Sequence, residues 1–98
     1  MDIEFNQDPI SEDWSCKIVG LTEQECDVAR NFSVASEALD AGAIGWGAQY
    51  LKNQDEFSAT VRAKDKETAH EAAKAYYGAI TEAVNENWNQ KAYYHIAS

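Results

Sequence analysis

The histidines and cysteines of this chain are the side chains best suited to act as bases, nucleophiles or metal ligands. His70 falls at the edge of the apolar face of an expected helix, and His95 lies near the end of the sequence. Neither stands in an H-x-x-x-H or H-E-x-x-H pattern, and Cys16 and Cys26 lack the spacing of a zinc site. We therefore expect no catalytic residues, no metal and no cofactor, and we interpret both cysteines as small buried residues in a reducing compartment.

Carboxylates are the abundant reactive groups, and most of their excess lies in one half of the sequence. The chain has 17 acidic and 8 basic residues, for a net charge of −9. Residues 1–49 hold 10 acidic and 2 basic residues, whereas residues 50–98 hold 7 and 6. Acid–base catalysis needs carboxylates in a cleft with contrasting environments, and these lie on expected exposed faces. The charge argues against direct nucleic-acid or membrane binding and favours a partner with a basic surface.

Acidic residues of the first half form the predicted partner-binding set, because together they resemble a line of backbone phosphates. Such an array can occupy a Lys/Arg groove made for nucleic acid and exclude the nucleic acid by electrostatic competition. The set is Asp2, Glu4, Asp8, Glu12, Asp13, Glu23, Asp27, Glu37 and Asp40. The alternative is an ordinary solvated helix face, with Arg30 paired locally to Asp27 or Glu37.

One amphipathic helix is predicted over residues 23–41, and it would carry the last four carboxylates of this set. Thr22 is a suitable N-cap, Glu25 completes a capping box, and Gly42 is the residue type expected just past the C-terminal end. The residues expected to face the core fall on one narrow arc: Val28, Phe32, Ala35 and Leu39. We expect the rest of the chain to support the opposite, acidic face.

The other segments alternate in a way that favours strands, with one further helix. A short edge strand can form over 2–5. The expected order is then a strand over 14–20, the helix over 23–41, strands over 43–51 and 56–64, a second helix over 66–88 and a last strand over 91–97. This order predicts an α+β fold, an antiparallel sheet with two helices on one face, most simply a ferredoxin-like split βαβ arrangement. A looser sheet with fewer strands is the alternative. Gly78, on the polar side of the second helix, costs about 1 kcal/mol relative to alanine, and the sequence offers no functional reason for it.

The length of the chain predicts one small domain, with residues 1–98 forming a single acidic α+β unit. No apolar run approaches the roughly 20 residues that span a bilayer. The N-terminal residues MDIEFNQDP lack the basic and apolar regions of a signal peptide. We therefore expect a cytoplasmic protein.

Two stretches carry a resemblance to a known class of proteins: MDIEFNQDPISEDW and TEQECDVARNFSVASEALDAG. The chain looks like the DNA-mimicking inhibitors that phages and prophages encode, and more narrowly it resembles the small anti-CRISPR proteins directed at the type I-F surveillance complex. The resemblance implies a protein of the bacterial cytoplasm that binds the DNA-recognition surface of the CRISPR RNA-guided complex. It would block target DNA without chemistry. The resemblance carries over no site residues, so the acidic set above is taken from this sequence alone.

A protein–protein adaptor is the second hypothesis, because aromatic residues are typical anchors of interfaces. The available aromatic residues are Trp14, Trp46, Tyr50, Trp88, Tyr93 and Tyr94. Binding through them would depend weakly on salt, whereas binding through the carboxylates would weaken as salt rises. An enzyme is the third hypothesis, and it needs a cleft that the sequence does not display.

Overall fold

The computed structural model describes residues 2–53 and 55–86, and within these ranges the chain forms four strands and three helices. The elements are β1 (Asp2–Gln7), β2 (Trp14–Leu21), α1 (Glu23–Ala29), α2 (Phe32–Asp40), β3 (Gly45–Leu51), β4 (Glu56–Ala63) and α3 (Lys66–Asn85). The predicted strand over 91–97 and the end of the predicted helix over 66–88 lie outside the described residues.

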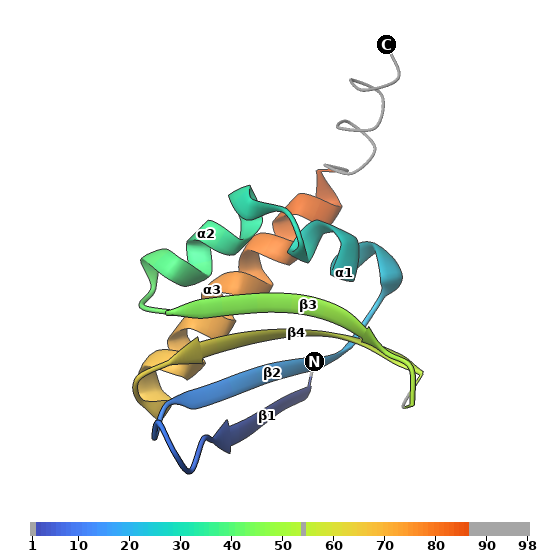
Figure 1. Ribbon diagram of the computed structural model, residues 1–98. Coiled ribbons are helices and arrows are strands. Elements are labelled where there is room, and N and C mark those ends of the chain that lie inside the picture. The colour runs from blue at the N-terminus through green and yellow to red at the C-terminus, as the bar shows by residue number, and fades with distance from the viewer. Residues whose placement is uncertain (1, 54, 87–98) are drawn as a thin grey trace.

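The strands form one sheet in the order β1-β2-β4-β3, and each neighbouring pair is antiparallel. All three helices lie over one face of this sheet (Figure 1). The predicted α+β fold, an antiparallel sheet with its helices on one face, is therefore confirmed. The order of β2, β4 and β3 is compatible with a ferredoxin-like arrangement. The outer place beside β2 is taken by β1, which reaches it through a hairpin.

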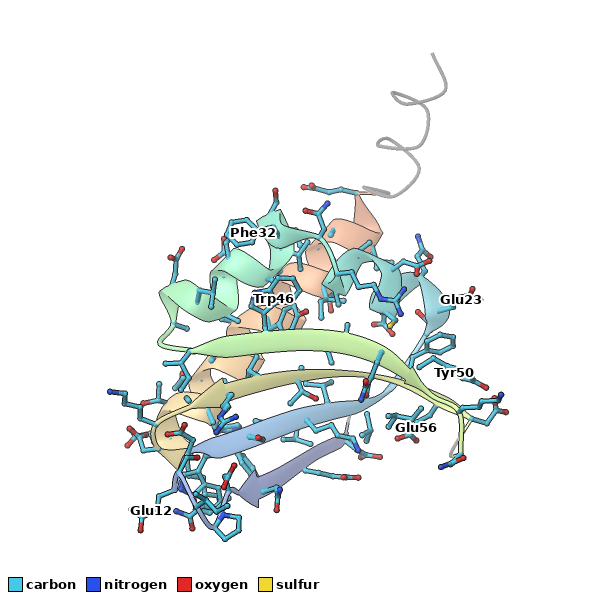
Figure 2. All side chains as sticks on the ribbon, viewed as in Figure 1. Glu12, Glu23, Phe32, Trp46, Tyr50 and Glu56 are labelled. Atoms are coloured by element: carbon cyan, nitrogen blue, oxygen red, sulfur yellow. The ribbon has the colours of Figure 1, made fainter. Side chains whose placement is uncertain are left out.

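The core lies between the sheet and the helices, and period-2 alternation sends the apolar side chains there. Val61 in β4 pairs with Cys16 in β2 and with Trp46 in β3, and all three belong to or pack on one hydrophobic cluster. Figure 2 shows Trp46 rising from β3 toward the helices. Ser58 falls on the polar phase of the alternation in β4, yet it is 0% exposed. It stands in a central strand, opposite Val19 of β2 and Gln49 of β3.

The predicted continuous helix over residues 23–41 is wrong, because the structure divides it into α1 and α2. The helix α1 ends at Ala29, and Arg30 is its C-cap. Asn31 then adopts an extended backbone, and its side-chain oxygen accepts a hydrogen bond from the Ser33 amide at 2.9 Å. An asparagine in this role caps a new helix instead of continuing the old one. Phe32, predicted to face the core, is consequently 65% exposed on the side of α2 away from the sheet (Figure 2).

The outer ends of both helices follow the local signals in the sequence. Thr22 and Glu25 form the predicted capping box, in which each side chain accepts a hydrogen bond from the other residue's amide, at 3.0 Å and 2.8 Å. Gly42 follows α2 with a φ of +110°, as a helix-terminating glycine should. The amides of Gly42 and Ala43 bond to the carbonyls of Leu39 and Ala38, which completes a Schellman motif.

Candidate partner-binding surface

The nine predicted carboxylates fall into three groups in the structure. The first group lies on β1 and the β1–β2 loop and contains Asp2, Glu4, Asp8, Glu12 and Asp13. The second group, on α1, contains Glu23 and Asp27. The third group, on α2, contains Glu37 and Asp40. Figure 2 shows Glu12, in the β1–β2 loop, and Glu23, at the start of α1, at opposite corners of the molecule. The break between α1 and α2 separates the second group from the third, so the carboxylates do not follow one helix face.

The β1–β2 loop, residues 8–13, uses one of these carboxylates to hold its own backbone. The Oδ1 atom of Asp8 accepts hydrogen bonds from the amides of Ile10 at 2.8 Å and Ser11 at 3.2 Å. These two backbone bonds are the largest causes that lower the pKa of Asp8 below its ordinary value, and the nearby Arg62 guanidinium lowers it further. Asp8 therefore stays ionised and builds the turn as well as adding charge.

Arg62 joins the same loop to the sheet from β4. Its Nη2 atom lies 3.5 Å from Oδ2 of Asp8, 3.3 Å from Oδ2 of Asp13 and 2.9 Å from Oγ of Ser11. Sequence reasoning missed this role, because Arg62 falls on the polar phase of the alternation in β4. The signal is long-range: the antiparallel register sets Arg62 opposite Ser15, close to the loop that precedes β2. Asp8 and Asp13, two members of the predicted partner-binding set, are therefore already in ion pairs with Arg62 inside the protein.

Two further carboxylates of the set make exposed ion pairs. Glu4 lies 3.9 Å from Nζ of Lys17, across the β1–β2 pair. Asp27 lies 3.8 Å from Nη1 of Arg30, whose Nε also donates to the Ala48 carbonyl at 3.4 Å. The local pairing of Arg30 with Asp27, considered from the sequence, is therefore present. Exposed pairs of this kind contribute little to stability, so a stronger cationic partner can compete for them.

The remaining five members of the set make no hydrogen bond or ion pair with their side chains in the described part of the chain. They are Asp2, Glu12, Glu23, Glu37 and Asp40. Most described cations are meanwhile occupied: Lys17, Arg30, Arg62 and Lys74 are in ion pairs. Lys66 lies over the rings of Phe5 and Trp14, 4.9 Å and 5.5 Å from their centroids. The described surface therefore offers far more free carboxylates than free cations.

A groove of about 440 Å³ runs between α2 and α3, and we call it the α2–α3 groove. Its lining includes Val34 and Glu37 from α2 and Ala75, Gly78, Ala79 and Glu82 from α3. The floor is thus small and apolar, and one exposed glutamate stands on each helix. The predicted set contains Glu37 but not Glu82. Only the packing of α2 against α3 brings these two residues to one groove, so the sequence carried no signal for the pairing.

The open face of the sheet, opposite the helices, carries two shallow hollows of about 460 and 390 Å³ that share Ser15 and Thr60. Their cationic neighbours are Arg62 and Lys17, and both are already in ion pairs with carboxylates. The hollows are therefore of mixed charge, and they present neither an acidic array nor an unpaired basic group.

The aromatic residues of the adaptor hypothesis are not brought together within the described residues. Trp14 and Trp46 are half-buried and pack on the core. Tyr50 is 43% exposed, donates a hydrogen bond to Asp55 and packs against Phe57 with ring centroids 4.8 Å apart. The other three candidates, Trp88, Tyr93 and Tyr94, lie outside the described residues.

The two cysteines are buried free thiols, and the described histidine packs against an aromatic ring. Burial raises the pKa of the Cys16 thiol to about 11 and also raises the pKa of Cys26, so both thiols are protonated at neutral pH. His70 packs edge-on against Phe5, with ring centroids 5.8 Å apart. Among residues 2–53 and 55–86, His, Cys, Asp and Glu form no group of three that could hold a metal ion.

None of the described helices has the length and apolar character needed to cross a membrane. Comparison of the chain with protein-family models, with curated proteins and with solved structures gives no match.

Proposed function

We propose that this protein is a non-enzymatic inhibitor that mimics DNA and blocks target binding by a type I-F CRISPR RNA-guided surveillance complex. The observation that carries the proposal is the excess of exposed carboxylates without a cationic partner among the described residues. Asp2, Glu12, Glu23, Glu37 and Asp40 all have this property. The place of action would be the cytoplasm of a bacterial host, and the partner is a protein surface instead of nucleic acid or membrane.

The mechanism is electrostatic competition for the same basic side chains. A surface built to bind DNA gains affinity from Lys and Arg contacts with phosphates and from the release of counterions. A carboxylate array satisfies those side chains in the same way, and the field of a protein with net charge −9 speeds the encounter. No bond is made or broken. Because the contacts are ionic and exposed, inhibition should weaken as the salt concentration rises.

The test is a competition assay with a purified type I-F surveillance complex and labelled target duplex at two salt concentrations. We expect the protein to block duplex binding, and to block it less well at the higher salt. Because α1 and α2 are separate helices, their carboxylates are tested separately, as Glu23→Lys/Asp27→Lys and Glu37→Lys/Asp40→Lys. Each double variant should weaken inhibition by about tenfold or more, because like charges would then face the basic surface.

The matched control is Glu56→Lys/Glu67→Lys, which changes the net charge by the same amount at exposed or half-buried residues outside the set. This control should inhibit nearly as well as the wild-type protein. Equal loss in all three variants would mean that net charge alone matters and that no defined surface is used. Full inhibition by folded variants of both helices, or no effect of the wild-type protein on duplex binding, would contradict the proposal.

The adaptor alternative receives less support from the described residues. Its aromatic candidates there are half-buried, or already bonded within the protein as Tyr50 is. If binding to the complex were insensitive to salt and to charge reversal, Tyr50→Ala would be the first variant to examine for that alternative.

A further inference from the structure

The α2–α3 groove combines features that the packing of this chain does not require. It has an apolar floor of small side chains, and it is rimmed by Glu37 on one helix and Glu82 on the other. The lining of α3 runs from Ala75 to Ala83, a rise of about 12 Å, or roughly two helical turns. The floor on α3 is therefore long enough to contact about two turns of another helix.

Gly78 lies in this floor, in the middle of a 20-residue helix, where glycine costs about 1 kcal/mol relative to alanine. Nothing among residues 2–53 and 55–86 explains this choice. Its backbone is not in the left-handed region, and a Cβ built there meets no atom within 4 Å. Glycine is the residue that lets another backbone approach closely. Its position in an open groove therefore points to a partner that packs against α3 at this residue.

The charge of the rim indicates what that partner carries. Glu37 and Glu82 make no ion pair within the described part of the chain, and Asp40 adds a third free carboxylate one turn beyond Glu37. The cation nearest along α3, Lys74, is 3.6 Å from Glu71 and so already paired. A second copy of this chain would bring the same carboxylates to the groove, and the like charges would repel each other. A partner element with Lys or Arg on both flanks is complementary.

We propose that the α2–α3 groove docks a basic amphipathic helix of the partner protein. Small or aliphatic residues of that helix would lie over Gly78, and Lys or Arg residues would face Glu37 and Glu82. This docking site rests on the function proposed above, since it names the element of the basic partner that one acidic region receives. It also assigns Glu82, which is absent from the predicted set, to the binding surface.

The direct test uses a synthetic peptide of about five helical turns, made of Leu, Ala and Lys, with the lysines on both flanks of one apolar stripe. The full-length ¹⁵N-labelled protein is titrated with this peptide and followed by amide chemical shifts. We expect shifts at Ser33, Gly78 and Glu82 and none in the β1–β2 loop. A peptide with Glu in place of Lys should not bind. Absence of shifts in the groove with the basic peptide would overturn the inference.

Two variants separate docking in the groove from general attraction. Gly78→Trp fills the groove from an open position, and the helix tolerates it because tryptophan is a better helix former than glycine. We expect at least tenfold weaker peptide binding. Glu82→Lys should weaken binding as well, whereas Glu67→Lys, the same change on the same helix but outside the groove, should not. Equal binding by wild type and Gly78→Trp, or equal losses in Glu67→Lys and Glu82→Lys, would refute the docking site.

The competition assay with the surveillance complex then distinguishes the two proposals. If the wild-type protein and Gly78→Trp inhibit equally, the docking site is wrong and the proposed function stands. If the wild-type protein does not inhibit but the basic peptide binds in the groove, the docking site stands and the proposed target is wrong. A self-associating wild-type protein that Gly78→Trp converts to a monomer would show that a second copy fills the groove instead.

Discussion

The β1–β2 loop and the α2–α3 groove are both acidic, yet the structure treats their carboxylates in opposite ways. In the loop, Asp8 and Asp13 share Arg62, and Asp8 also accepts two backbone hydrogen bonds. In the groove, Glu37 and Glu82 make no described ion pair. The loop thus uses part of its charge to fix its own conformation, whereas the two glutamates of the groove have no ionic partner among the described residues.

Topology explains the difference. The antiparallel pairing of β2 with β4 sets Arg62 beside a loop that is about fifty residues away in the sequence. A helix can supply cations only from positions three and four residues away. Around Glu37 those positions hold Ser33, Val34, Asp40 and Ala41, none of which is basic. The number of carboxylates in a sequence therefore says little about how many are available for binding.

The largest expected effect comes from Gly42, which sets where α2 ends against the start of α3. An alanine there would have to adopt a φ of +110°, and its Cβ would lie 2.5 Å from Cγ2 of Thr68. We expect Gly42→Ala to lower the free energy of unfolding by about 2 kcal/mol, measured by urea denaturation. It should also weaken binding in the groove while leaving the β1–β2 loop unchanged in amide shifts.

The control for Gly42→Ala is the same substitution at Gly78. There the added Cβ meets no atom and the residue lies within a helix, so Gly78→Ala should raise the free energy of unfolding by about 1 kcal/mol. Adding Thr68→Ser to Gly42→Ala removes the colliding methyl group but not the backbone strain. It should restore only part of the stability. Similar stability of the two alanine variants would contradict this account of the groove.

The second effect concerns Tyr76, which ties α3 to the end of α1. The buried Tyr76 hydroxyl donates a hydrogen bond to the Ala29 carbonyl. Tyr76→Phe leaves that buried acceptor unsatisfied and should cost about 1–2 kcal/mol by urea denaturation. The control is Tyr77→Phe, a half-buried tyrosine whose hydroxyl makes no described hydrogen bond, which should be nearly neutral. Equal costs of the two variants would mean that the Tyr76 hydrogen bond is not responsible.

Tyr76 also makes the free energy of unfolding depend on pH in the alkaline range. Burial raises the pKa of Tyr76 above its ordinary value of 10.0. Its contribution is therefore complete below about pH 10 and is lost as the pH rises toward the folded-state pKa, because the unfolded chain ionises first. Wild-type stability should fall more steeply above pH 10 than that of Tyr76→Phe, and the two curves should approach each other. The β1–β2 loop, which lacks a buried tyrosine, should not contribute to this slope.

Local signals in the sequence were sufficient for many parts of the fold. The capping box of Thr22 and Glu25, the terminating Gly42 and the β3–β4 hairpin all depend on residues close together in the chain. The break at Asn31 was also local, but the apolar periodicity of Val28, Phe32, Ala35 and Leu39 concealed it. An N-cap side chain competes with helix continuation, and here the cap prevailed over the periodicity.

The candidate surface was less predictable, because its important relations are long-range. The ion pairs of Arg62 with Asp8 and Asp13 follow from strand register, which no short pattern reveals. The joining of Glu37 and Glu82 follows from how α2 packs on α3. The acidic character of the surface could be predicted from the composition. Which carboxylates lack an ionic partner could be determined only from the fold.

The smallest expected effect comes from a substitution that leaves the carboxylates of the loop without an ionic partner, as those of the groove already are. Arg62→Gln removes the cation and leaves Asp8 and Asp13 without an ionic partner. The exposed pair with Asp13 is worth about 0.2–1 kcal/mol, so the loss of stability should be small and should shrink in high salt. The pKa of Asp8 should stay below its ordinary value, because its largest causes are the backbone amides of Ile10 and Ser11.

The lowered pKa of Asp8 determines how its contribution to stability depends on pH. A carboxylate whose folded-state pKa is lowered stabilises the fold above its unfolded pKa, near 3.8 for Asp8, and this contribution is lost as the pH falls through the folded-state value. NMR titration of the Asp8 carboxyl in the wild type and in Arg62→Gln should give two low values that differ slightly. A return of the Asp8 pKa to 3.8 in the variant would show that Arg62, and not the backbone, holds it down.

Binding by Arg62→Gln then compares the two acidic regions directly. The variant frees two carboxylates in the loop and leaves the rim of the groove untouched. If the partner is held mainly in the groove, affinity for the basic peptide should stay within about twofold of the wild type, since distant exposed charges are screened. If affinity rises several-fold and amide shifts appear at residues 8–13, the loop is a contact region. Its pairing with Arg62 in the free protein is then what limits binding there.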